Sequence, residues 1–309
     1  MTDDASLIAA QHESRRRFLA LVAEIRPELH RYCARMVGSI ADGEDVVQDT
    51  LARAYYALPE METMPPLRPW LFQIAHRRAL DHLKRYDVRM REPLEAAPDG
   101  AGGASDPDEA LAREEAARGA ITRFLDLAPA QRSAVVLKDV LGHSLEEIAA
   151  LLDATLPAVK ATLHRGRARL RESPGPTRGA RAASPLIARY AELFNARDWD
   201  GVRALLAEDV RLDLVSRVRR EGKANVGNYF SNYERLDDWH LVPAWLDGRE
   251  IVAVYRDARA AHPAYFLELA HADGRVVAIR DFRYVPYIAR EADVKVTAGD
   301  GGDAACRNP

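Results

Sequence analysis

The sequence predicts a multidomain protein in which two all-α domains are followed by one α+β domain. Three observations lead to this fold class. Apolar residues recur at helical spacing through most of the first 172 residues. A helix-turn-helix pattern closes that part of the chain. After residue 185, helical spacing gives way to alternating runs that are typical of strands, and helices followed by strands indicate an α+β domain.

Composition narrows the class of protein. The chain has 309 residues, of which 48% are apolar, so two or three domains with real cores are expected. The net charge of −3 hides two basic stretches, Arg77–Arg91 and Lys160–Arg171, and nucleic-acid binding follows such local charge. Cys33 and Cys306 have no metal-ligand or disulfide spacing, and no apolar run or signal peptide points to a membrane. We expect a cytoplasmic protein without metal or cofactor.

Linkers divide the chain into domains. An acidic segment rich in Ala, Gly and Pro separates the two helical parts, and a second linker holds two prolines and two glycines. The residues after 290 have the composition of a disordered tail. The expected segments are a helical domain at 10–87, a linker at 88–108, a helical domain at 109–172, a linker at 173–184, an α+β domain at 185–290 and a tail at 291–309.

The first helical domain contains two conspicuous helices after an opening one, whose apolar stripe includes Leu29 and Tyr32. Asp42 is expected to cap the first of them. The polar face of that helix carries Asp45, Gln48, Asp49 and Arg53. After a proline-rich loop, the helix Trp70–Arg85 has an aromatic start and a basic end.

The second helical domain ends in the helix-turn-helix. Ser144 and Glu147 have capping-box spacing, and Thr155 can cap the next helix. The residues predicted to face inward on that helix are Val159, Leu163, Gly166 and Leu170, and those on the outer face are Lys160, His164, Arg167 and Arg171. Such a helix can lie in the major groove of DNA.

Three segments, 42–54, 70–85 and 128–137, together with the helix-turn-helix, resemble regions 2 and 4 of bacterial RNA polymerase sigma factors. In order and spacing they resemble the extracytoplasmic-function sigma factors over roughly residues 10–172. The resemblance implies a region 2 helical bundle and a region 4 helix-turn-helix. It also implies a promoter-specificity subunit that is not an enzyme, and whose partners are core RNA polymerase and promoter DNA.

The resemblance implies roles for matching residues. Those that would bind core polymerase are Asp45, Gln48, Asp49 and Arg53. Those that would contact minus-ten DNA are Arg68, Trp70, Gln73, His76, Arg77, Arg78, Lys84 and Arg85. Those that would contact minus-thirty-five DNA are Thr155, Ala158, Lys160, Ala161, His164, Arg165, Arg167 and Arg169. The loop 59–69 matches the segment that captures a flipped minus-ten base, but it has no aromatic residue, so the capturing side chain stays open.

The third domain is expected to hold three helices wrapped by an antiparallel meander. Asp247-Gly248 and Asp273-Gly274 indicate tight hairpins between successive strands. The expected strands are 210–214, 240–246, 250–255, 265–271 and 275–285. The segments 195–200 and 205–210 resemble the cone-shaped SnoaL-like domains, and this resemblance implies that the domain modulates sigma activity through an intramolecular contact with the sigma domains.

Two alternatives remain for the whole chain. It could be a helix-turn-helix regulator that senses a small ligand through the cone, or a SnoaL-like cyclase or isomerase with a DNA-binding appendage. The acid/base set imagined for an enzyme is Asp213, His240, Arg280 and Asp281. Polar residues inside strands are common because side chains alternate, so we assign no catalytic residue and expect the aromatic residues of this domain to form its core.

Overall fold

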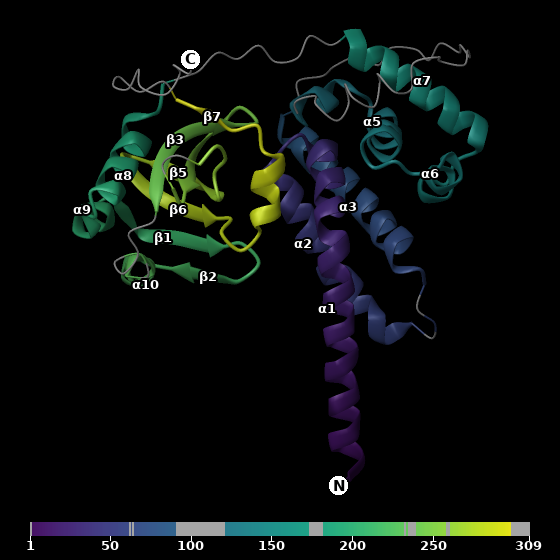
Figure 1. The fold of residues 1–309 in the computed structure, drawn as a ribbon, viewed down its shortest axis with the longest axis horizontal. Helices are drawn as coiled ribbons and strands as arrows, with labels where there is room; N and C mark the ends of the chain where they lie inside the picture. Colours follow the sequence, from purple (N-terminus) through teal and green to yellow (C-terminus); the bar gives the residue numbers. More distant parts are fainter. Residues whose placement is uncertain are drawn as a thin grey trace. The chain divides into compact units, whose positions relative to one another are not determined.

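The computed structural model describes residues 2–61, 63, 65–90, 121–172, 182–231, 233, 239–257 and 260–297. The chain forms two compact units, Met1–Pro176 and Thr177–Pro309 (Figure 1). The first is all-α and the second is α+β, which confirms the predicted fold class. Most of the two predicted linkers and the last twelve residues lie outside the described residues.

The first unit opens with three helices, α1 (Thr2–Val37), α2 (Ile40–Ala57) and α3 (Leu67–Met90), with a 3₁₀ turn, η1 (Leu58–Glu60), after α2. Gly38 has a φ of 74° and ends α1. Ser39 then caps α2 by accepting a hydrogen bond from the Asp42 N–H at 3.2 Å. The prediction that Asp42 is the cap is therefore wrong. Asp42 lies in the first turn, because the helix begins two residues earlier.

The remaining elements of this unit are η2 (Ile121–Asp126), α5 (Pro129–Val135), a π-helical turn η3 (Val136–Val140), α6 (Leu145–Leu152) and α7 (Leu156–Glu172). The capping box of α6 is confirmed. Ser144 Oγ accepts from the Glu147 N–H at 3.0 Å, and the Glu147 carboxylate accepts from the Ser144 N–H at 2.8 Å. The four predicted inward residues of α7 are all buried, so the helix-turn-helix is confirmed.

One apolar core joins the two helical parts of this unit. Leu29 and Met36 of α1 and Phe72 of α3 belong to the same buried cluster as Phe124 of η2 and Val135 of α5. The helix-turn-helix part therefore packs on the three-helix part. None of the described helices combines the length and the hydropathy that a bilayer span requires.

The second unit places three helices, α8 (Pro185–Asn195), α9 (Trp199–Ala204) and α10 (Lys223–Phe230), with a seven-stranded sheet. Helix α8 packs on β3 and α10 packs on β1 (Figure 1). The strands are β1 (Leu206–Leu214), β2 (Val218–Glu221), β3 (His240–Leu246), β4 (Arg249–Tyr255), β5 (Tyr265–Ala272), β6 (Arg275–Asp281) and β7 (Lys295–Val296), and a 3₁₀ helix η4 (Pro286–Glu291) follows β6.

The hairpin predictions for this unit are confirmed. Asp247 and Gly248, and likewise Asp273 and Gly274, all have positive φ, as type I′ turns require. These turns connect β3 to β4 and β5 to β6, whose pairing is antiparallel.

Three features of the sheet differ from prediction. Strand β1 pairs in parallel with β6, so the sheet is mixed and extends beyond the expected meander. Strand β2 was not predicted; its four residues are exposed and show no apolar alternation. Strand β7 lies in the segment that was predicted to be a disordered tail, and it pairs with β3. The described part of the chain ends at residue 297.

Candidate nucleic-acid and protein interface

A groove of about 600 Å³ runs between α2 and α3. Among its lining residues, the Asp49 carboxylate accepts a hydrogen bond from Arg53 Nε at 3.3 Å and lies 3.8 Å from Arg78. Arg78 also pairs with Asp81. The groove is lined by Asp45, Val46, Asp49, Arg53, Arg78, Asp81, His82, Lys84 and Arg85. Three predicted polymerase-binding residues thus share one surface with three predicted DNA-binding residues.

Gln48 is the predicted polymerase-binding residue that does not line this groove. Its amide donates a hydrogen bond to Glu44 at 3.4 Å. The Glu44 carboxylate is fully buried and pairs with Arg26 of α1. Gln48 therefore belongs to a polar contact between α1 and α2.

Helix α3 exposes only part of the predicted minus-ten set. Arg77, Lys84 and Arg85 are exposed, whereas Gln73 and Arg78 are half-buried. Trp70 is also half-buried and packs against the apolar core, so its ring is partly structural. Arg68 is exposed at the start of α3, and its guanidinium pairs with Glu28 of α1.

His76 lies in a cluster of three polar side chains from three helices. Its Nδ1 is 2.7 Å from the hydroxyl of Tyr32 and 3.3 Å from that of Ser133, and these two hydroxyls are hydrogen-bonded at 2.7 Å. Tyr32 and Ser133 are completely buried. Burial, helped by the nearby charge of Arg77, lowers the pKa of His76 below its ordinary value. The ring is therefore neutral at pH 7.

A second polar cluster centres on Glu28. Its carboxylate pairs with Arg68 and lies 3.6 Å from His143, which follows η3 and makes an edge contact with the Phe72 ring. Burial raises the pKa of Glu28, but His143 and Arg68 lower it by more, and the result lies below the ordinary value.

Arg132 adds a third polar contact between the two helical parts. Its buried guanidinium donates to the carbonyl of Met36 in α1 and, at 3.0 Å, to that of Leu127. Sequence reasoning missed the roles of Tyr32, Arg132 and Ser133. The only available signal was that Tyr32 occupies a predicted apolar stripe while carrying a hydroxyl that needs a partner when buried.

Helix α7 presents most of the predicted minus-thirty-five set. Thr155, Ala158, Lys160 and Arg169 are exposed, and Ala161, His164 and Arg165 are half-buried. Thr155 Oγ1 accepts a hydrogen bond from the Ala158 N–H at 3.4 Å, so Thr155 also caps the helix as predicted.

Arg167 corrects the prediction of an outward-facing side chain. It is 7% exposed and makes a two-pronged ion pair with Asp139 of η3, with contacts of 2.6 and 3.0 Å. The buried face of α7 is wider than its apolar residues alone suggested, because it also includes Arg167, which pairs with the buried Asp139. Arg167 is thus part of the support of α7.

In the second unit, Asp281 is the buried member of the imagined acid/base set. Its carboxylate accepts hydrogen bonds from the Tyr229 and Tyr233 hydroxyls and, at 2.8 Å, from the Arg283 N–H. Burial raises its pKa by more than these donors lower it. A cavity of about 320 Å³ adjoins it, lined by Leu214, Tyr229, Asp281, Arg283 and Tyr284.

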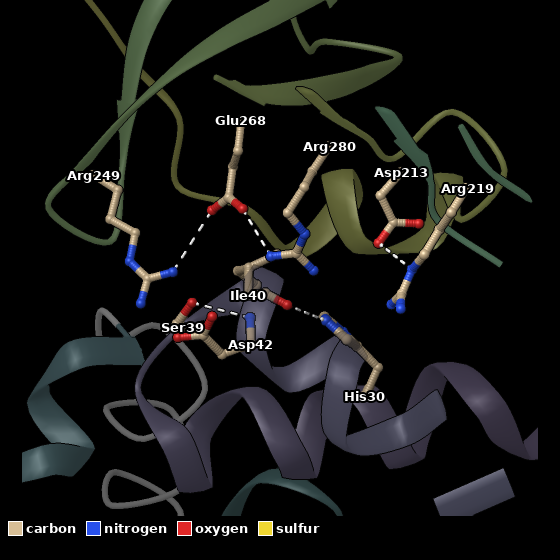
Figure 2. A network of polar contacts seen from close by, with 9 residues as sticks. All are labelled: His30, Ser39, Ile40, Asp42, Asp213, Arg219, Arg249, Glu268 and Arg280. Atoms are coloured by element: carbon tan, nitrogen blue, oxygen red, sulfur yellow. Dashed lines mark hydrogen bonds and ion pairs between the residues drawn. The ribbon is translucent and has the colours of Figure 1, made fainter. Parts of the chain in front are cut away.

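Two other members of that set, Asp213 and Arg280, are register partners on β1 and β6, and each pairs with a residue outside the set. Asp213 pairs with Arg219 at 3.3 Å, and Arg280 pairs with Glu268 at 2.9 Å. Figure 2 shows the Glu268 carboxylate between Arg280 and Arg249, whose guanidinium is 3.7 Å away. His240 is exposed at the start of β3. The structure does not assemble the four residues into one site.

Comparisons with known proteins match the first unit to two family regions. The sigma-70 region 2 family matches residues 21–89, and the sigma-70 region 4 family matches residues 122–170. The chain is 32% identical over 220 residues to the ECF RNA polymerase sigma factor SigG of Mycobacterium tuberculosis, an alignment that covers 61% of this chain and 58% of SigG. It is 35% identical over 166 residues to the RNA polymerase sigma factor CarQ of Myxococcus xanthus, covering 51% of this chain and 89% of CarQ.

The solved structure of the M. tuberculosis extracytoplasmic function sigma factor SigJ aligns with 87% of this chain and 98% of its own length, at 22% identity and a TM-score of 0.36. A region 2 helical bundle followed by a region 4 helix-turn-helix defines the sigma-70 class of proteins. The chain belongs to the extracytoplasmic-function RNA polymerase sigma factors.

Proposed function

We propose that this chain is a promoter-specificity subunit of RNA polymerase, acting in the cytoplasm. The proposal depends on two features that occur in the same unit. One is the charged groove between α2 and α3, and the other is a helix-turn-helix whose second helix buries its apolar face. Region 2 would bind core polymerase and the minus-ten element, and region 4 would read the minus-thirty-five element.

The polymerase contact is assigned to the α2–α3 groove. Asp45 and Arg53 are exposed on α2, and Asp49 lies between Arg53 and Arg78. Such a mixed acidic and basic surface suits the clamp helices of the largest polymerase subunit, because complementary charges fix the register of two helices. Arg78 would belong to this contact as well as to the DNA contact.

The DNA contacts are assigned by exposure. Arg77, Lys84 and Arg85 on α3 would meet phosphates, and Lys160, with the half-buried His164 on α7, would meet base edges in the major groove. Co-purification of the full chain with core polymerase, followed by run-off transcription on a promoter library, tests the proposal. A chain that does not bind core polymerase would contradict it.

Region 4 makes a sharper prediction. Lys160→Ala and His164→Ala should each weaken initiation at promoters with an intact minus-thirty-five element by about 1–3 kcal/mol, because each removes a base contact. Lys295→Ala, an exposed lysine of the second unit, is the control. If minus-thirty-five mutations affect these variants as strongly as wild type, the assignment of these two residues is wrong.

For the second unit we propose a regulatory role. Asp213 and Arg280 of the imagined acid/base set pair with residues outside that set, and Asp281 is held by tyrosines of its own domain. Truncation after Glu172 should change run-off transcription by reconstituted polymerase, since an intramolecular contact with the sigma domains would be lost. Identical behaviour of truncated and full-length proteins would count against this role. An Asp281→Ala variant that loses a measurable turnover while transcription persists would instead favour an enzyme.

A further inference from the structure

We infer that Tyr32 is a positioning residue for promoter reading, because its hydroxyl holds His76 as a single-donor imidazole with the proton on Nε2. The part of this inference that concerns DNA contact by His76 rests on the proposed function. The pairing itself is visible in the structure. Tyr32 Oη lies 2.7 Å from His76 Nδ1, and both side chains belong to region 2, on α1 and α3.

The chemistry of the two groups decides where the protons lie. A phenol is a stronger acid than the N–H of a neutral imidazole, and an imidazole nitrogen is a stronger base than a phenol oxygen. The favoured arrangement therefore has the Tyr32 O–H donating to Nδ1. When one ring nitrogen accepts a hydrogen bond, the proton of a neutral imidazole resides on the other.

The surroundings keep both partners in that state. Tyr32 is completely buried, and its ring makes an edge contact with Phe72, which fixes the hydroxyl in place. Desolvation raises the pKa of Tyr32, so the phenol stays protonated, and lowers that of His76, so the imidazole stays neutral. Ser133 can donate to the Tyr32 oxygen without displacing the bond to His76.

The remaining nitrogen is the functional end. Within the part of the chain that the structure describes, no protein group is hydrogen-bonded to His76 Nε2. A neutral N–H donor suits an acceptor on a minus-ten base, such as a ring nitrogen or a carbonyl oxygen. Because it carries no charge, this contact would add to base discrimination without adding to the salt dependence that phosphate contacts produce.

Nitrogen-15 NMR of histidine-labelled full-length protein tests the tautomer directly. The His76 signals, assigned with His76→Gln, should show an unprotonated Nδ1 and a protonated Nε2 at pH 7.5. Tyr32→Phe/Ser133→Ala removes both hydroxyls that lie within reach of Nδ1 and should give averaged nitrogen shifts of two exchanging tautomers. Ser133→Ala removes a hydroxyl from the same cluster and should leave the tautomer unchanged. A proton on Nδ1 in the wild type overturns the inference, whatever the outcome for either variant.

Promoter selectivity provides the second readout. In reconstituted holoenzyme, Tyr32→Phe and His76→Ala should each reduce preference at one and the same minus-ten position by about five- to fifty-fold, and the double variant should lose no more. The salt dependence of promoter binding should not change. If wild-type holoenzyme initiates nowhere, the proposed function fails while the tautomer result stands. If it initiates and Tyr32→Phe keeps full selectivity, the positioning role is refuted.

Discussion

At the scale of single residues, the buried carboxylate of Asp281 has the clearest energetic consequence. It has no exposed surface and accepts hydrogen bonds from Tyr229 and the Arg283 N–H. A buried carboxylate prefers its neutral form, and its raised pKa means that the folded domain holds a proton more tightly than the unfolded chain does.

The sign of the resulting pH dependence follows. Between the ordinary pKa of 3.8 and the raised folded value, the folded state binds more protons than the unfolded state, so stability falls as the pH rises through that interval. Asp281→Asn mimics the protonated acid. It should match the stability of wild type near pH 4 and be more stable than wild type at neutral pH.

Hydrogen exchange of the β6 amides in full-length protein measures this difference, since comparison at equal pH cancels intrinsic exchange rates. Asp213→Asn is the control, because Asp213 pairs with Arg219 at the surface. Equal protection of wild type and Asp281→Asn at every pH would show that the carboxylate is not strained.

At the scale of secondary-structure elements, features that depend on neighbouring residues could be predicted from the sequence. Pairings between residues far apart in the chain could not. The Ser144–Glu147 capping box and the Asp247-Gly248 turn follow from residues within a few positions of each other. The parallel pairing of β1 with β6 joins residues about seventy positions apart, and no local pattern specifies it. The same limit applied to the site, where exposed Lys160 was predictable but buried Arg167 depended on its distant partner Asp139.

Helix α7 depends on that partner for its placement. The Asp139 carboxylate is fully buried against Arg167. At the preceding residue of α7, a Cβ added to Gly166 would come within 2.8 Å of Val135. Asp139→Asn should destabilise region 4 by about 3–5 kcal/mol, because it leaves a buried guanidinium without its counter-charge.

Chemical denaturation of the full chain, followed by helical circular dichroism, measures that loss. The double variant Asp139→Leu/Arg167→Met replaces the pair with apolar side chains and should recover most of the stability. Asp49→Asn, which disrupts the exposed pair with Arg53, should cost about 1 kcal/mol or less. An Asp139→Asn variant as stable as wild type would mean that the pair does not support α7.

At the scale of the whole molecule, the packing of region 4 on region 2 conflicts with simultaneous reading of two promoter elements. Ser133 of region 4 is hydrogen-bonded to Tyr32 of region 2, and one apolar core joins the regions. The minus-ten and minus-thirty-five elements are about 25 base pairs apart, or roughly 85 Å of B-DNA at 3.4 Å per base pair. Even α1, with its 36 residues, spans only about 54 Å. If regions 2 and 4 read the two elements at once, as proposed, region 4 must leave region 2.

Energy transfer between two dyes measures this separation. The dyes are attached at two exposed positions, Glu24→Cys on α1 and Glu172→Cys at the end of α7. The variant also carries Cys306→Ser, and Cys33 needs no replacement because it is buried. Transfer should be efficient in the isolated protein and weak once core polymerase binds.

Ser133→Glu places a carboxylate against the buried Tyr32 hydroxyl and should separate the regions without polymerase. The Ser133→Glu protein should also bind core polymerase more tightly than wild type. In the variant the regions are already separated, whereas in wild type only a minor fraction of molecules has separated regions. Ala130→Glu adds the same charge at an exposed position of α5 and should behave like wild type. Efficient transfer that persists in the holoenzyme would show that the regions stay together, and the two-element reading would then be untenable.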